Sequence, residues 1–90
     1  MNATTAARLI AELMTLSPRA RFARLILRLA GEDGLVRATQ EDLGRLAGMS
    51  RASFRRSFAD IIASGAVRTE YGGVRILDRP ALERESLAEP

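Results

Sequence analysis

Three arginines within the segment Thr39 to Phe58 are the side chains of this chain best suited to chemistry. Arg51, Arg55 and Arg56 follow Ser50, a residue type that commonly caps the start of a helix. Arginine presents five N–H donors in a planar fork that fits a phosphate or the edge of a guanine. The N-terminal end of a recognition helix is the part that meets base edges and phosphates, so this grouping predicts binding to nucleic acid.

Catalytic and metal-binding chemistry has little support in the composition. The chain has no Cys and no His, which excludes disulfides and thiolate metal sites and removes both the commonest metal ligand and the usual general base. Hydroxyl groups of Ser, Thr and Tyr are present, but the sequence offers no base to activate them. We expect no enzymatic activity and no cofactor.

The charge of the chain is basic and unevenly spread. All 14 basic side chains are Arg, which gives an isoelectric point of 10.9 at a net charge of only +3. Segments 1–38 and 50–75 each carry +3, whereas 39–49 carries −1 and 76–90 carries −2. The predicted recognition helix therefore lies in one of the two segments that carry a net positive charge. The exclusive use of Arg suits bidentate contacts with phosphate or guanine, and it equally fits the codon usage of a G+C-rich genome.

Length and hydropathy indicate one compact domain. Ninety residues, 47% of them apolar, can form a single small core. The sequence has no run of about 18 apolar residues that would cross a membrane and no secretory signal pattern. We therefore expect a cytoplasmic protein.

Two short helices are predicted to position the arginines. Leu43 and Ala47 lie four residues apart on the first helix. Gly44 has no side chain, so a second helix can cross the first one closely at this position. Gly48 supplies the tight turn between the two helices. This arrangement is typical of a helix-turn-helix.

The second helix carries the basic side chains on its outer face. Thr39, with Asp42 three residues later, predicts a capping box at the start of the first helix. The recognition helix is predicted from about Arg51 to Ser64, with Gly65 just beyond its end. Its buried stripe has the spacing i, i+4, i+7, i+8 and comprises Phe54, Phe58, Ile61 and Ile62.

Two further helices are predicted before the helix-turn-helix. An amphipathic helix over residues 1–16 has Leu9, Leu13 and Leu16 on one side. Ser17-Pro18 ends it and starts the next helix, which Gly31 ends. The apolar stripe of that second helix is Phe22, Leu25, Ile26, Leu29 and Ala30.

The remaining patterns predict a small β-structure and a last helix. After the turn Glu32-Asp33-Gly34, Leu35 to Ala38 form a short strand. Strands Ala66 to Thr69 and Val74 to Leu77 flank Tyr71-Gly72-Gly73, whose glycines permit the positive φ of a hairpin. A helix capped by Asp78 and begun by Pro80 has Leu82 and Leu87 available to pack. The predicted fold of residues 17–90 is a winged helix-turn-helix, mainly α with a small β-hairpin.

The order and identity of these elements resemble the DNA-binding domain of the Crp/Fnr family of bacterial transcription regulators. The resemblance covers roughly three quarters of the chain. Members of that family usually join a cyclic-nucleotide-binding-like sensor to a long dimerisation helix and this domain, and no small-molecule sensor fits in the present sequence. The matching residues are Leu16 to Arg21, Leu25 to Ala30, Thr39 to Gly44, Gly48 to Arg51 and Val74 to Asp78.

The resemblance implies that certain residues of the helix-turn-helix bind double-stranded DNA. It implies that Thr39, Gln40 and Ser50 touch phosphates, while Arg51 and Arg56 face bases in the major groove. Many family members carry a Glu where this chain has Ala52, which offers only a methyl contact, for example to thymine. The family's usual target sequence is therefore not assumed. The remaining candidate DNA-binding residues are Ser53, Arg55 and Tyr71.

Several positions depart from the family pattern. Phe54 and Phe58 stand where smaller aliphatic residues are common. In the wing, Glu70 and Gly73 occupy places that are often small or basic, which weakens phosphate contact there. For Tyr71 we favour a role in covering the core over a hydrogen bond to phosphate.

Ile62 occupies a position that tends to be polar in the family. We favour a slightly rotated helix that buries it. The alternative is an apolar partner surface shared with Ala59, Ala63 and Ala66.

The functional alternatives follow from these departures. We favour a sequence-specific DNA binder acting in transcription, over a protein-interaction winged helix and over an RNA-binding module, which the few aromatic residues disfavour. A homodimer could use Leu9, Leu13 and Leu16, or the same helix could fold back onto its own domain. The arginines before the helix-turn-helix are interpreted as solvated helix faces, with Arg19 and Arg21 near enough to a helix start to approach the DNA backbone; this group is Arg8, Arg19, Arg21, Arg24 and Arg28.

Overall fold

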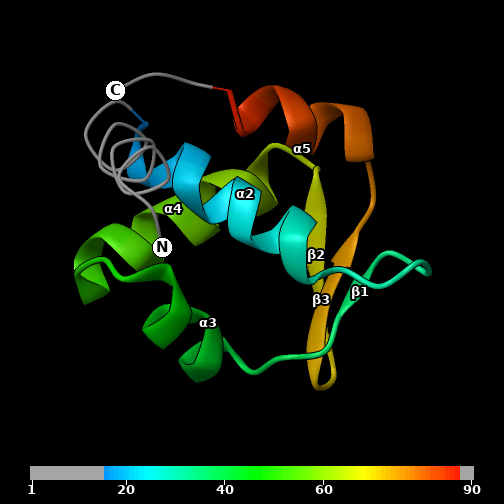
Figure 1. The fold of residues 1–90 in the computed structure, drawn as a ribbon, viewed down its shortest axis with the longest axis horizontal. Helices are drawn as coiled ribbons and strands as arrows, with labels where there is room; N and C mark the ends of the chain where they lie inside the picture. The colour runs from blue at the N-terminus through cyan, green and yellow to red at the C-terminus, as the bar shows by residue number, and fades with distance from the viewer. Residues whose placement is uncertain (1–15, 88–90) are drawn as a thin grey trace, which may run out of the picture.

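The computed structural model describes residues 16–87 (Figure 1). The predicted amphipathic helix over 1–16, with Leu9 and Leu13, lies outside this range except for Leu16. The described elements occur in the order α2 (Pro18–Leu29), β1 (Leu35–Val36), α3 (Gln40–Ala47), α4 (Arg51–Ala63), β2 (Val67–Glu70), β3 (Gly73–Ile76) and α5 (Arg79–Glu85). The predicted fold, mainly α with a small hairpin in a winged helix-turn-helix, is confirmed. Among residues 16–87, no helix is both long and apolar enough to cross a membrane.

Each described helix begins at a side chain that caps it. Ser17, Thr39, Ser50 and Asp78 accept a hydrogen bond from a backbone N–H three residues ahead, at 3.0 to 3.1 Å. These caps satisfy N–H groups that have no partner inside the helix, so they fix where each helix starts. All four caps were readable in the sequence.

The sheet has three antiparallel strands in the order β1-β3-β2. β3 is central. Val36 of β1 lies opposite Val74 of β3, and Val67 of β2 lies opposite Ile76 of β3. Gly72 provides the positive φ of the hairpin turn, at 75°. Gly73 has a different role from the one predicted, because a Cβ atom there would lie 2.3 Å from the carbonyl oxygen of Val36. Only a glycine lets β1 approach β3 so closely.

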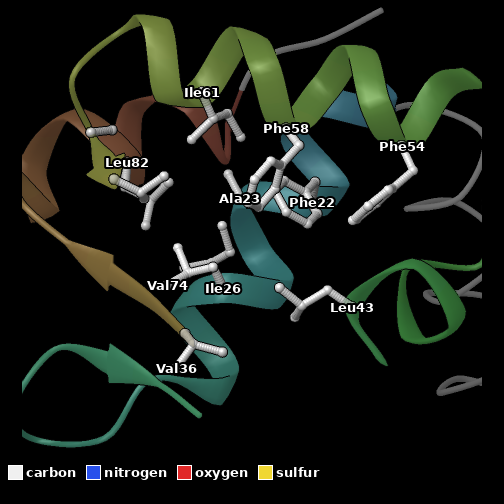
Figure 2. Packing of buried hydrophobic residues seen from close by; sticks show 12 residues of the cluster. Phe22, Ala23, Ile26, Val36, Leu43, Phe54, Phe58, Ile61, Val74 and Leu82 are labelled. Atoms are coloured by element: carbon white, nitrogen blue, oxygen red, sulfur yellow. The ribbon is translucent and has the colours of Figure 1, made fainter. Parts of the chain in front are cut away.

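The core lies where α2 crosses α4, and the sheet closes one side of it (Figure 2). Phe22 of α2 makes edge-to-face contacts with Phe54 and Phe58 of α4, each at 5.3 Å between ring centroids. Leu43 brings α3 against this cluster, and Leu82 brings α5 against its other end. The two phenylalanines of α4 therefore fix α4 on α2.

Some apolar residues predicted to be buried are exposed. Ile62 is 36% exposed, because Phe54, Ser57, Phe58 and Ile61 already form the buried side of α4. The predicted rotation of α4 that would bury Ile62 is therefore wrong.

Apolar residues at the ends of α2 and α5 also differ from the prediction. Leu29 is exposed because α2 buries Ala20, Phe22, Ala23 and Ile26 instead. α2 ends at Leu29 with Ala30 as its cap, and Gly31 directly follows this cap, in agreement with its predicted place at the end of the helix. Leu87 lies past the end of α5 and is 68% exposed, so it does not pack as predicted.

Candidate nucleic-acid interface

The outer face of α4 presents three arginines that no other described residue engages. Arg51, Arg55 and Arg56 are exposed, and no hydrogen bond or ion pair engages their side chains within residues 16–87. Ala52 is exposed between them, and Ser53 is half-buried. The side chains that point the other way, Phe54 and Phe58, are held in the core. Packing thus fixes which face of α4 is free and leaves that face with three available cations.

A groove of about 640 Å³ runs between α3 and α4 beside these arginines. Arg51 and Arg55 line it, whereas Arg56 lies outside it. Gln40, in the first turn of α3, lines the opposite wall. The remaining lining residues are Glu41, Gly44, Arg45, Met49 and Phe54. Arg45 of α3 and Met49 of the turn are not among the predicted DNA-binding residues, and the packing of α3 on α4 places them in this groove.

Gly44 lines this groove where α3 faces Phe54 of α4. A Cβ atom at Gly44 would lie 3.7 Å from the Phe54 ring, which is an ordinary van der Waals contact. The place where α3 meets α4 therefore has room for a methyl group, so the predicted need for a residue without a side chain at Gly44 is not strict. Gly48, by contrast, adopts φ 63° in the turn, as its predicted role requires.

Hydroxyl groups at the starts of α3 and α4 are already used as caps. Thr39 Oγ1 accepts from Asp42 N at 3.0 Å, and Asp42 Oδ2 accepts from Thr39 N at 3.3 Å, which forms the predicted capping box. The hydrogen bonds with Thr39, reinforced by Arg45, lower the pKa of Asp42. Ser50 Oγ accepts from Ser53 N at 3.1 Å. A hydroxyl that accepts one hydrogen bond keeps its own O–H as a donor, so Thr39 and Ser50 retain a proton to offer a phosphate.

The wing carries arginines that a carboxylate already engages. Arg68 and Arg75 stand directly opposite each other in the hairpin, and such a pair of like charges is unfavourable. Glu70 accepts from both, with 2.9 Å to Arg68 Nη2. These hydrogen bonds, first from Arg75 and then from Arg68, lower the pKa of Glu70. The strand pair therefore carries a net charge of +1, with one carboxylate shared by its two arginines.

Tyr71 stands at the tip of the wing and is fully exposed, at 108% of its reference area. The prediction that it covers the core is wrong, because the two-residue turn carries its ring away from the sheet. The wing tip and α3 both lie at the lower edge of the molecule in Figure 1. The phenol is left free to contact a ligand.

Three arginines of α2 are not solvated as predicted. Arg19 pairs with Glu85, Arg21 donates to carbonyl groups at the end of α3, and Arg24 Nε donates to the Ser86 carbonyl at 2.9 Å. They hold α3 and α5 against α2. Arg28 is exposed, in accordance with the prediction for it.

Comparison with known proteins identifies the domain. A sequence model described as a Crp-like helix-turn-helix domain matches residues 20–85. The chain belongs to this Crp-like family. No curated protein sequence matches it. The match confirms the resemblance to Crp/Fnr regulators and the class of the domain, which is that of a DNA-binding domain of a transcription regulator.

Solved structures agree with the Crp-like assignment. A CRP/FNR-family transcriptional regulator from Thermus thermophilus is 24% identical, with a TM-score of 0.80 over 97% of this chain and 49% of that one. A CRP-family regulator from the same organism is 32% identical, with a TM-score of 0.71 over 87% of this chain and 44% of that one. The catabolite activator protein of Thermus thermophilus is 27% identical, with a TM-score of 0.66 over 93% and 39%. The Crp-like chain thus spans half or less of the length of each.

Proposed function

We propose that this Crp-like domain binds double-stranded DNA in a sequence-specific way, with α4 in the major groove. The observation that carries the proposal is the free, outward face of α4 with Arg51, Arg55 and Arg56. Arginine forks read guanine O6 and N7 and bind phosphates, and three of them lie close to the N-terminal end of the helix.

We assign the side chains of the interface by position. Arg51 and Arg56 face bases, and Ala52 between them contacts a thymine methyl group. Thr39, Gln40 and Ser50 donate to phosphates that flank the groove, and helix N-termini favour such anions. Arg55 and Ser53 contact the same backbone, and Tyr71 donates to a phosphate near the wing.

We further propose that the domain works in a homodimeric regulator in the bacterial cytoplasm, where its DNA is. Dimeric helix-turn-helix proteins read two half-sites about 34 Å apart. Leu9 and Leu13 supply a candidate dimer seam. The solved relatives are named as transcriptional regulators, which supports a role in transcription for this domain.

A protein-interaction module is the second candidate, and two observations favour it. Ile62 is exposed at the C-terminal half of α4. A separate groove of about 510 Å³ exposes Leu29 and Leu46 between α2, β1 and α3. The arginines on α4 have no role in this alternative.

Selection of bound sequences from a random pool of double-stranded DNA separates the two candidates. We expect a palindromic motif, and binding to it should weaken with salt at a log-log slope of about −0.9 per phosphate contact. Failure to enrich any sequence, with no affinity for DNA at low salt, would contradict DNA binding and favour the protein-interaction module.

A further inference from the structure

Arg21 links α2 to the turn of the helix-turn-helix. It lies in the first turn of α2, and its Nη2 donates to the carbonyl oxygens of Ala47 at 3.3 Å and Gly48 at 3.4 Å. Ala47 is the last residue of α3, and Gly48 is its cap. A single guanidinium from another helix therefore closes the end of α3.

The position of this cation has a physical reason. The last carbonyls of a helix lack intrahelical donors and concentrate about half a negative charge at its C-terminus. Both contacts are long for hydrogen bonds, so attraction between the guanidinium and these carbonyls provides much of the interaction. Arg21 is half-buried, which limits the screening of this attraction by water.

The turn that carries these two carbonyls leads directly into α4. Only Gly48, Met49 and Ser50 separate α3 from Arg51. Gly48 holds the left-handed conformation, at φ 63°, and Ser50 caps α4 through Ser53 N at 3.1 Å. A shift of the turn would therefore move the capped end of α4, which carries the free arginines.

The neighbour of Arg21 fixes the other part of α4. Phe22 packs edge-to-face on Phe54 in the first turn of α4 and on Phe58 one turn further along, each with 5.3 Å between ring centroids. Two consecutive residues of α2 thus hold the helix-turn-helix. Arg21 contacts the turn between α3 and α4, and Phe22 contacts α4 itself. Arg21 is the polar half of this attachment.

We propose that Arg21 is a positioning residue that fixes the turn between α3 and α4 and so sets the angle at which α4 meets DNA, without touching DNA itself. The inference rests on the proposed DNA-binding function. A direct contact between Arg21 and a DNA phosphate is the competing explanation of the same residue. The two explanations differ in the salt dependence of binding and in the behaviour of the free protein.

The experiment compares Arg21→Ala with Arg28→Ala, which removes the same charge from an exposed residue at the other end of α2. In the free protein, hydrogen exchange at the amides of Ser53 and Phe54 reports on the start of α4, since both donate to Ser50. We expect exchange there to accelerate about tenfold in Arg21→Ala and to stay unchanged in Arg28→Ala. Unchanged exchange in Arg21→Ala would overturn the proposal.

Binding to the selected DNA supplies the second readout. Arg21→Ala should lower the affinity about tenfold while its salt slope stays equal to that of the parent. A slope reduced by about 0.9 would instead identify Arg21 as a phosphate contact and overturn the proposal. Arg21→Lys keeps a cation near the carbonyls and should recover most of the affinity; affinity as low as that of Arg21→Ala would contradict the positioning role.

Two further results keep the test decisive. If Arg21→Ala fails to fold, Arg21→Lys is compared with Arg21→Gln instead. Arg21→Gln loses the charge but keeps an N–H donor. Equal rates of hydrogen exchange at the Ser53 amide in these two variants would overturn the proposal. A parent protein that does not bind DNA would overturn the proposed function, while the exchange measurement would still test by itself whether Arg21 fixes the turn.

Discussion

Single arginines in this domain differ in whether an oxygen atom already engages them. In the described part of the chain, Arg37 pairs with Asp33, Arg45 with Glu41 and Asp42, and Arg68 and Arg75 with Glu70. The arginines of α4 have no such partner among residues 16–87. Exposed ion pairs contribute little to stability, but each pair lowers the charge available to a phosphate. Pairing therefore reduces the charge that these arginines can offer to a phosphate, whereas the arginines of α4 keep theirs.

Glu70→Gln should strengthen DNA binding. The amide keeps the shape of the side chain but removes the negative charge that engages Arg68 and Arg75. The salt slope should become steeper by about 0.9 for each arginine that then reaches a phosphate. Glu83→Gln on α5 makes the same change of charge beside Arg79 and serves as the control. Equal slopes in the two variants, measured by fluorescence anisotropy, would show that the wing stays off the DNA.

Gly73→Ala should destabilise the domain, because the added methyl group would meet the Val36 carbonyl at 2.3 Å and push β1 from β3. We expect a loss of about 1 to 3 kcal/mol in the free energy of unfolding, as for other overpacked sites. Gly44→Ala is the matched change at a helical glycine with room for a methyl group, and it should stabilise by about 0.5 to 1 kcal/mol. Urea titration measures both, and a Gly73→Ala protein as stable as the parent would refute this role of Gly73.

At the scale of elements, α4 combines a core-facing side with two different outer parts. Its N-terminal half exposes arginines, and its C-terminal half exposes Ala59, Ile62 and Ala63. The i, i+4, i+7, i+8 pattern placed Ile62 in the core, and the structure uses Ser57 on the buried side instead. Ser57 is buried while Ile62 is exposed, so hydrophobicity alone does not decide which face of α4 lies in the core.

Ile62→Gln should therefore cost less than about 1 kcal/mol of unfolding free energy, as surface substitutions usually do. Ile61→Gln, at the neighbouring and fully buried position, should cost about 3 kcal/mol or more, because it places an unpaired amide in the core. Thermal unfolding followed by circular dichroism compares the two variants. Similar losses in both would mean that Ile62 is buried after all.

Sequence reasoning succeeded for the elements whose signals are local. The caps at Ser17, Thr39, Ser50 and Asp78, and the turn at Gly48, follow from residue types at short spacing. It failed where contacts join distant segments. The attachment of Arg21 to α3 spans 26 residues, and the need for Gly73 arises from β1. The exposure of Tyr71 also could not be read from the order of residues around a turn.

At the scale of the whole molecule, stability should vary little from about pH 5 to pH 9 and fall in acid. The chain has no His and no Cys to titrate in that range. Hydrogen bonds lower the pKa values of Asp33, Asp42 and Glu70 below their usual 3.8 and 4.5. A lowered pKa contributes stability above the unfolded value and loses it as pH falls through the folded value.

The predicted loss of stability in acid can be tested at Asp42, which forms the capping box with Thr39. The unfolding free energy should decline below about pH 4.5, and Asp42→Asn should reduce it at pH 7 while flattening the decline. Urea titrations at a series of pH values measure this, and an equally steep decline in Asp42→Asn would show that Asp42 does not take part.

The central claim is that α4 reads DNA through arginines that nothing in the described domain engages. The most direct measurement is the ratio of affinities for the selected site and a scrambled site. The double variant Arg51→Ala, Arg56→Ala should lose about 1 to 3 kcal/mol of discrimination per arginine, and circular dichroism must match the parent. The double variant Arg28→Ala, Arg84→Ala removes the same charge from two exposed arginines outside α4 and should keep the ratio. Equal ratios in the two double variants would contradict the claim.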